Sequence, residues 1–133
     1  MRYEITKDLE TGNALIDSEH RELFLAINNL LDSCASGKGR ENIESTVKFL
    51  NNYVKKHFFD EEQLQLKNKY PGYEEHKQFH EKYKKDLKSA AQEILEQGPT
   101  FAALSKVNKT IGVLVSHIRT EDKKVAAHIK AIA

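Results

Sequence analysis

Glycine and proline, the residues that most often interrupt helices, are confined to a few places in this chain of 133 residues. They cluster at Gly37 and Gly39, at Pro71 and Gly72, and at Gly98 and Pro99, with Gly12 and Gly112 standing alone. The intervening stretches are long and cover residues 16–36, 40–70, 73–97 and 100–133. This distribution predicts four helices joined by short loops.

Apolar residues recur within each stretch at intervals of three and four, which places them on one face of a helix. Residues 40–70 show the pattern most clearly, with Ile43, Val47, Leu50 and Val54. Stripes of this length suit a compact bundle, and short loops make consecutive helices antiparallel. We therefore expect an all-α, up-down-up-down antiparallel four-helix bundle. Residues 1–16, with a turn at 11–13, are expected to form an N-terminal arm folded over it.

Histidine and carboxylate side chains hold several inward-facing positions of these stripes. They are His20, His57, Glu61, His76, His80, His117 and Asp122. Burying so many polar groups without partners would cost several kcal/mol at least. Imidazoles and carboxylates together suit transition metals, iron especially, and bundle proteins build metal sites from ligands on facing helices. The pattern therefore predicts a metal site at one level of the bundle.

The spacing between the last two of these residues is unusual. Asp122 follows His117 by five positions, whereas residues three or four apart share a face of a regular helix. We therefore expect a local irregularity such as a π-bulge, a form often found at functional sites. In a regular helix, Glu121 would replace Asp122 in the site. Glu62, beside Glu61, is expected to be solvated.

The order and spacing of these residues resemble the hemerythrin family of non-haem di-iron proteins. The resemblance is carried by residues 16–20 (IDSEH), 57–61 (HFFDE), 76–80 (HKQFH, shortly after Tyr70 and Pro71) and 117–122 (HIRTED). A single HxxxE or HxxxH would be a weak signal, whereas the combination is strong. The resemblance covers nearly the whole chain and implies one hemerythrin-like domain over residues 1–133, similar to stand-alone bacteriohemerythrins.

The resemblance also implies a cofactor, a centre of two iron ions joined by an oxo or hydroxo bridge. One iron would be held by three imidazoles, those of His76, His80 and His117. The other would be held by two, those of His20 and His57. Glu61 and Asp122 would bridge the pair. The iron with two imidazoles would then keep an open coordination position, where dioxygen would bind.

A pocket for dioxygen is implied in the same way. Its lining would be Leu23, Phe58, Val113 and Ile118. The family usually places a tryptophan at the position of Val113, and this chain contains no tryptophan. We therefore expect a roomier or more open pocket, which adds weight to oxygen-consuming chemistry.

Several functions remain compatible with these residues. We expect a protein that binds dioxygen reversibly, for storage, delivery or sensing, more than an enzyme. The alternatives are a di-iron oxidase or peroxidase that consumes oxygen or peroxide, an iron-reserve or sensing module, and a bundle whose histidines hold zinc.

Composition excludes other classes. The 21 lysines and arginines balance 20 aspartates and glutamates, so nothing favours a nucleic-acid or anionic-membrane partner. No apolar run approaches the roughly 18 residues of a membrane span, and no signal-peptide pattern opens the chain. Cys34 is the single cysteine, which excludes an internal disulfide and suits a reducing compartment. A cytoplasmic location is expected.

Overall fold

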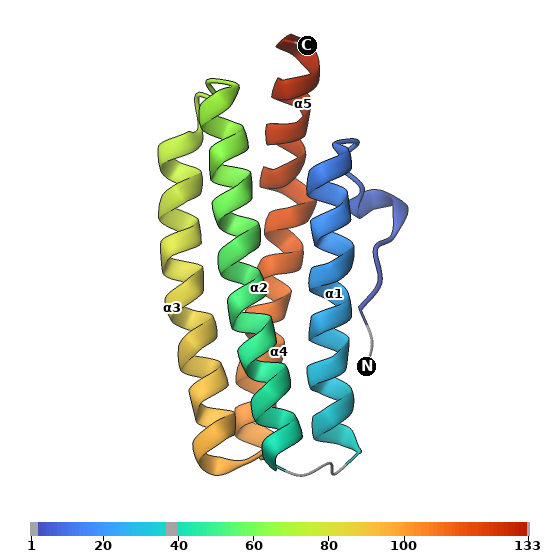
Figure 1. The fold of residues 1–133 in the computed structure, drawn as a ribbon, viewed down its shortest axis with the longest axis vertical. Helices are drawn as coiled ribbons and strands as arrows, with labels where there is room; N and C mark the ends of the chain where they lie inside the picture. Colours follow the sequence, from blue (N-terminus) through green and yellow to red (C-terminus); the bar gives the residue numbers. More distant parts are fainter. Residues whose placement is uncertain (1–2, 37–39, 133) are drawn as a thin grey trace.

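The computed structural model describes residues 3–36 and 40–132, and within them the chain is helical with no strand. The long elements are α1 (Ala14–Ala35), α2 (Arg40–Lys67), α3 (Tyr73–Gln97) and α4 (Phe101–His117). A π-helical turn, η2 (Ile118–Asp122), joins α4 to α5 (Lys123–Ile132). Figure 1 shows that α4, η2 and α5 form one continuous rod beside the other three helices. The predicted all-α fold is confirmed.

The helices end where the sequence predicted interruptions. Gly98 follows α3 with φ of +81°, a left-handed conformation that favours glycine. The Thr100 hydroxyl then accepts a hydrogen bond from the Ala103 N–H and caps α4. Pro71 and Gly72 lie between α2 and α3. The predicted loop at 37–39 lies outside the described residues.

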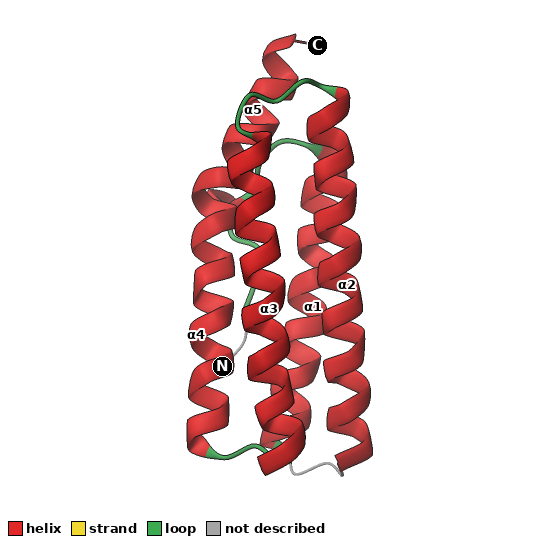
Figure 2. Ribbon diagram, turned by 90° about the vertical axis from the view of Figure 1, so that its left-hand side faces the viewer, coloured by secondary structure: helices red, strands yellow, loops and turns green. Residues whose placement is uncertain are grey.

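Each long helix packs against the next one along the chain. In Figure 2 the chain reverses direction between successive helices, which gives the predicted up-down-up-down order. The end of α2 therefore lies beside the start of α3, and the start of α1 lies at the same end of the bundle (Figure 1). This topology brings sequence-distant residues to one level.

The predicted N-terminal arm is also present. A short 3-10 helix, η1 (Lys7–Leu9), buries Leu9 against the main core. The backbone N–H of Tyr3 donates to Asn28 Oδ1, and Asn28 Nδ2 donates back to the Tyr3 carbonyl, both at 2.8 Å. These paired bonds fasten the arm along α1.

Buried apolar residues form two separate clusters. The larger fills most of the bundle, and the smaller consists of Ile16, Val125 and Ala126. Along α1, His20 lies between Ile16 of the small cluster and Leu23 of the large one. A polar layer thus separates the two apolar regions.

No described helix combines the length and apolar character needed to cross a membrane.

Candidate metal centre

The seven polar side chains singled out from the sequence lie together in this layer. They are His20, His57, Glu61, His76, His80, His117 and Asp122. Each exposes at most 5% of its surface. They come from α1, α2, α3, α4 and η2, so the layer joins every long helix of the bundle.

The first group of donor atoms consists of one oxygen of Glu61 and three imidazoles. Glu61 Oε1 is 2.6 Å from His76 Nε2 and 3.2 Å from His80 Nε2. His117 Nε2 is 3.0 Å from His76 Nε2. All four residues offer donor atoms within 4.8 Å of one another, so this group could hold one metal ion.

The other two imidazoles form a second group with both carboxylates. His20 Nε2 is 3.0 Å from Asp122 Oδ2, and His57 Nε2 is 3.9 Å from Glu61 Oε2. Their donor atoms also lie within 4.8 Å of one another. Two neighbouring groups therefore exist, with three imidazoles in one and two in the other.

Each carboxylate lies between the two groups. Glu61 directs Oε1 toward His76 and His80, and its Oε2 is the oxygen nearer His57. Asp122 directs Oδ2 toward His20, while its Oδ1 is 3.1 Å from the Nε2 atoms of both His76 and His117. One oxygen of each residue can therefore serve each group.

The π-helical turn η2 brings Asp122 into the layer. The wider turn rotates the residue five positions after His117 back to the inner face, so Asp122 is 1% exposed. The predicted irregularity is confirmed. Glu121 instead points outward and accepts a hydrogen bond from Lys124 Nζ at 3.2 Å, so the alternative that placed it in the site is wrong.

Two further carboxylates hold imidazoles from outside. His57 Nδ1–H donates to Glu19 Oε1 and His80 Nδ1–H donates to Glu62 Oε2, both at 2.9 Å. A carboxylate at Nδ1 holds each ring in the tautomer whose Nε2 lone pair faces the layer. The expectation that Glu62 is solvated is wrong, because its side chain is 12% exposed and bonded to His80.

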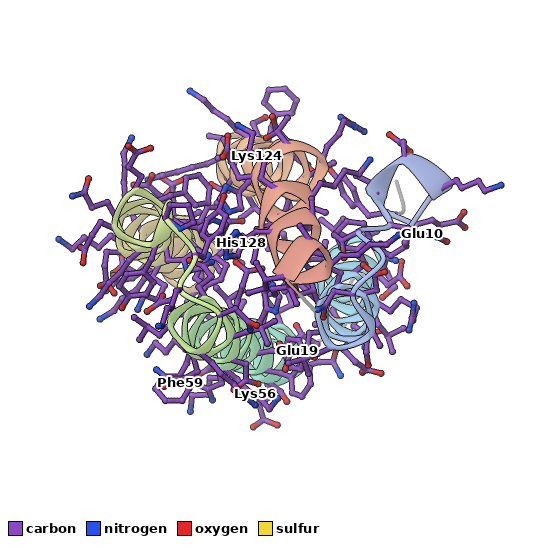
Figure 3. The ribbon with its side chains drawn as sticks, turned by 90° about the horizontal axis from the view of Figure 1, so that it is seen from above. Glu10, Glu19, Lys56, Phe59, Lys124 and His128 are labelled. Atoms are coloured by element: carbon purple, nitrogen blue, oxygen red, sulfur yellow. The ribbon has the colours of Figure 1, made fainter. Side chains whose placement is uncertain are left out.

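Sequence reasoning missed Glu19, although a signal was present. Glu19 lies three positions after Ile16 and four before Leu23, which is inward spacing. Its second oxygen accepts a hydrogen bond from Lys56 Nζ at 3.0 Å. Figure 3 labels both residues, on the side of the bundle where α1 and α2 lie. The ammonium group neutralises the carboxylate, and Glu19 is therefore tolerated at 5% exposure.

Burial controls which imidazoles stay neutral. It lowers the pKa of His57 and of His80, so both rings remain in the uncharged form that binds metals. Burial also lowers the pKa of His76, but the carboxylates of Asp122 and Glu61 outweigh it and raise that pKa to about 9. His76 therefore differs from His57 and His80 in favouring its charged form when no cation is bound.

The pKa values of the two central carboxylates are shifted in opposite directions. Burial, reinforced by the charge of Asp122, raises the pKa of Glu61 to about 8. Burial also raises the pKa of Asp122, but the nearby imidazoles of His117, His20 and His76 outweigh it and hold that pKa well below its usual range. Glu61 therefore holds a proton far more readily than Asp122 does.

Several buried polar atoms of the layer have no hydrogen-bond partner. Among the described residues, Glu61 Oε2, His80 Nε2 and Asp122 Oδ1 are buried and have no hydrogen-bond partner. Asp122 Oδ1 lies 3.1 Å from His76 Nε2, and His80 Nε2 lies 3.2 Å from Glu61 Oε1, but neither pair is aligned as a hydrogen bond. Such orphaned atoms are rare in proteins. Their lone pairs are the ones that a metal ion accepts, so the donor set fits a pair of cations.

The residues implied for a dioxygen pocket divide into two places. Leu23, Phe58 and Ile118 expose 1% or less, and the Phe58 ring stacks on His80 with ring centroids 3.8 Å apart. Val113 is 45% exposed and lines a surface hollow with Tyr83 and Thr110. Val113 therefore lies at the flank of the α4 stripe, apart from the three buried residues, and its place in a dioxygen pocket stays a prediction.

A second surface hollow reaches the layer. Its lining includes His76 and His117 together with Tyr70, Glu75 and Glu121. These two histidines are the most exposed of the five, at 5% each. The group with three imidazoles is therefore closer to solvent than the group with two.

Five imidazoles and two shared carboxylates, held in a dry layer of a four-helix bundle, define a helical protein class built to hold a pair of cations. Comparisons with known proteins give the same answer. The model of the family described as "Hemerythrin HHE cation binding domain" matches residues 11–129. The chain belongs to the hemerythrin family.

Two curated relatives extend this likeness over most of the chain. Myohemerythrin of Theromyzon tessulatum is 29% identical over 122 residues, which cover 92% of this chain and 89% of the relative. Myohemerythrin of Sipunculus nudus is 29% identical over 111 residues, which cover 83% of this chain and 79% of the relative.

Proposed function

We propose that this protein holds two iron ions in the polar layer and binds dioxygen reversibly. The observation that carries the proposal is the placement of Glu61 and Asp122, each of which lies between a group of three imidazoles and a group of two. Membership of the hemerythrin family supports the choice of iron.

The unequal groups assign the residues. His76, His80 and His117 would hold one ion, and His20 and His57 the other, with Glu61 and Asp122 shared. Ferrous ions held by these residues would supply the electrons for dioxygen binding, on the side with fewer imidazoles. The chain's own part is to keep all five imidazoles neutral and correctly oriented, a task in which Glu19 and Glu62 fix two of the rings.

The buried apolar side chains of the dioxygen pocket account for the reversibility of dioxygen binding. Leu23, Phe58 and Ile118 offer no hydrogen-bond donor, and their burial excludes water from that side. A ligand that enters there finds no proton source among these three side chains, so it can leave again as dioxygen. We assign these three residues to the dioxygen pocket.

One observation favours the alternative of an oxidase or peroxidase. The hollow over His76 and His117 brings solvent close to the layer. A reductant or peroxide could approach the three-imidazole group by this route, which oxygen carriage does not require.

Adding air to the anaerobic ferrous protein separates these functions. A new visible absorption band that appears with air, disappears under argon and returns over repeated cycles supports reversible binding. Irreversible bleaching to the diferric form contradicts it and supports turnover.

A pair of histidine variants tests the assignment of the two-imidazole group. His57→Ala should lower the iron content and abolish the oxygen-dependent band. His128→Ala is the matched control, because His128 lies outside the layer and its Nε2–H donates to the Asn68 carbonyl oxygen at 2.8 Å. Unchanged iron content and spectrum in His57→Ala would contradict the assignment.

A further inference from the structure

Gln65 of α2 is fully buried, yet its side-chain amide has no partner. Its exposed fraction is 0%, and neither Nε2 nor Oε1 makes a hydrogen bond within the described structure. Leaving such a group unpaired in the interior destabilises the fold. A buried amide with both ends unpaired therefore needs a specific reason.

The position of Gln65 on α2 supplies that reason. His57, Glu61 and Gln65 are spaced by four residues, so Gln65 lies one turn beyond the shared carboxylate on the same helix face. Side chains four apart are neighbours, with Cβ atoms about 5–6 Å from each other. Glu61 Oε2 is itself buried without a hydrogen-bond partner.

The surroundings offer Gln65 little else. Leu64, the preceding residue, packs against the small apolar cluster of Ile16, Val125 and Ala126. The backbone carbonyl of Gln65 is already used, since it accepts from the Tyr70 N–H at 2.9 Å. The side-chain amide is therefore the free polar group beside Glu61.

We propose that Gln65 is a positioning residue for Glu61. Its amide N–H donates to Glu61 Oε2 when that oxygen also binds a cation. A carboxylate oxygen has two lone pairs, so it can ligate and accept a hydrogen bond at once. Carboxylate ligands are commonly held in this way by a neighbouring donor. The inference rests on the proposed function only in requiring a cation at Glu61.

The role predicts effects of opposite sign on the two forms of the protein. In the metal-free form, the amide is a buried polar group without a partner, so an apolar side chain of similar size should be neutral or stabilising. In the metal-bound form, the same replacement removes the donor that orients Glu61, and metal affinity should fall. A merely structural role would move both forms in the same direction.

Gln65→Met, compared with Gln63→Met, tests the proposal. Gln63 is exposed on the same helix, so its variant controls for the chemical change alone. Zinc affinity, measured by competition with a chromophoric chelator, should fall about 10-fold in Gln65→Met and stay unchanged in Gln63→Met. The melting temperature of metal-free Gln65→Met should equal or exceed that of the unmodified protein. The visible absorption of the cobalt-loaded protein should shift in Gln65→Met alone.

Several outcomes would overturn the proposal. Zinc affinity within twofold of the unmodified protein, or equal destabilisation of the metal-free and metal-bound forms, would show that Gln65 does not act on Glu61. If Gln65→Met does not fold, Gln65→Leu provides the same comparison, and failure of both variants to fold would establish a structural role instead. Zinc does not bind dioxygen, so this result is independent of whether the iron protein carries oxygen.

Discussion

The two ends of the bundle treat buried polar groups differently. At the apolar end, built around Leu30, Val47, Ile94 and Val107, each buried polar side chain has a partner within the chain. Ser33 donates to Asn42 at 2.6 Å, and Thr110 donates to the Lys106 carbonyl at 2.9 Å. At the polar end, formed by the seven-residue layer, Gln65 and the cluster of Ile16, Val125 and Ala126, six buried atoms of the described residues have none.

The difference shows where the sequence specifies a complete core and where it leaves room for a ligand. A protein core normally pairs its polar atoms, and the apolar end does so. The orphaned atoms of the described structure all lie on His20, Glu61, Gln65, His80 and Asp122, within or one turn from the polar layer. We infer that the apolar end is self-sufficient and the polar end is completed by metal.

Removing the metal should give the largest effect and should affect only one end. With the metal at about 1,000 times its Kd, binding stabilises the native protein by about 4 kcal/mol. Chelation should therefore accelerate amide hydrogen exchange by up to about 1,000-fold around His20, His57 and Asp122. Amides around Val47 and Val107 should change far less. A uniform change along the whole chain would contradict the division into two ends.

A cavity created at the apolar end should destabilise the protein whether or not metal is bound. Ile27 is 1% exposed, and Ile27→Ala should lower the free energy of unfolding by about 2–5 kcal/mol. The loss should be the same with and without metal, as measured by urea unfolding. Leu25→Ala, at a position 51% exposed on the same helix, is the control and should cost much less. A loss confined to the metal-bound form would break the comparison.

Weakening one imidazole's support should give a smaller effect, confined to the polar end. Glu19→Gln removes the charge that holds His57 Nδ1–H and should lower metal affinity about 10-fold, or about 1.4 kcal/mol. Glu22→Gln, at an exposed position of α1, is the matched control. If both variants bind zinc equally well, Glu19 does not support His57.

The smallest effect should come from Cys34 at the apolar end. Burial raises the pKa of its thiol, so the folded protein keeps the proton after the unfolded chain has lost it. Stability should therefore fall as pH rises above about 8.5, the usual thiol pKa. The urea midpoint should drop more between pH 7 and pH 9.5 in the unmodified protein than in Cys34→Ala. Equal drops would show that the thiol titrates normally.

The fold was predictable because helix period and chain interruptions carry most of it. The four stretches between glycine and proline positions contain the long helices, and the interval between His117 and Asp122 predicted the π-helical turn. A five-residue interval between two inward polar side chains has few other solutions, so one irregular spacing was enough. The seven side chains also meet at one level as expected, although their role as iron ligands remains a proposal.

The supporting residues were less predictable, because periodicity identifies a face but not its edges. Val113 and Glu62 both lie at flanks of their stripes. The sequence-based expectation was wrong for Glu62, and the place of Val113 in a pocket stays a prediction. Whether a flank position is covered depends on how two neighbouring helices rotate, which no single stripe encodes. Gln65 sits at a regular inward interval, but a lone glutamine carries no recognisable metal chemistry.

Metal titration of the chelator-treated protein tests the central claim most directly. If two metal ions complete the polar end, cobalt added to the metal-free protein should saturate at two ions per chain, one for each group of donor atoms. The melting temperature should rise until that point and then stay constant. Saturation at one ion, or binding without any gain in stability, would contradict the claim that the layer is built for a pair of metals.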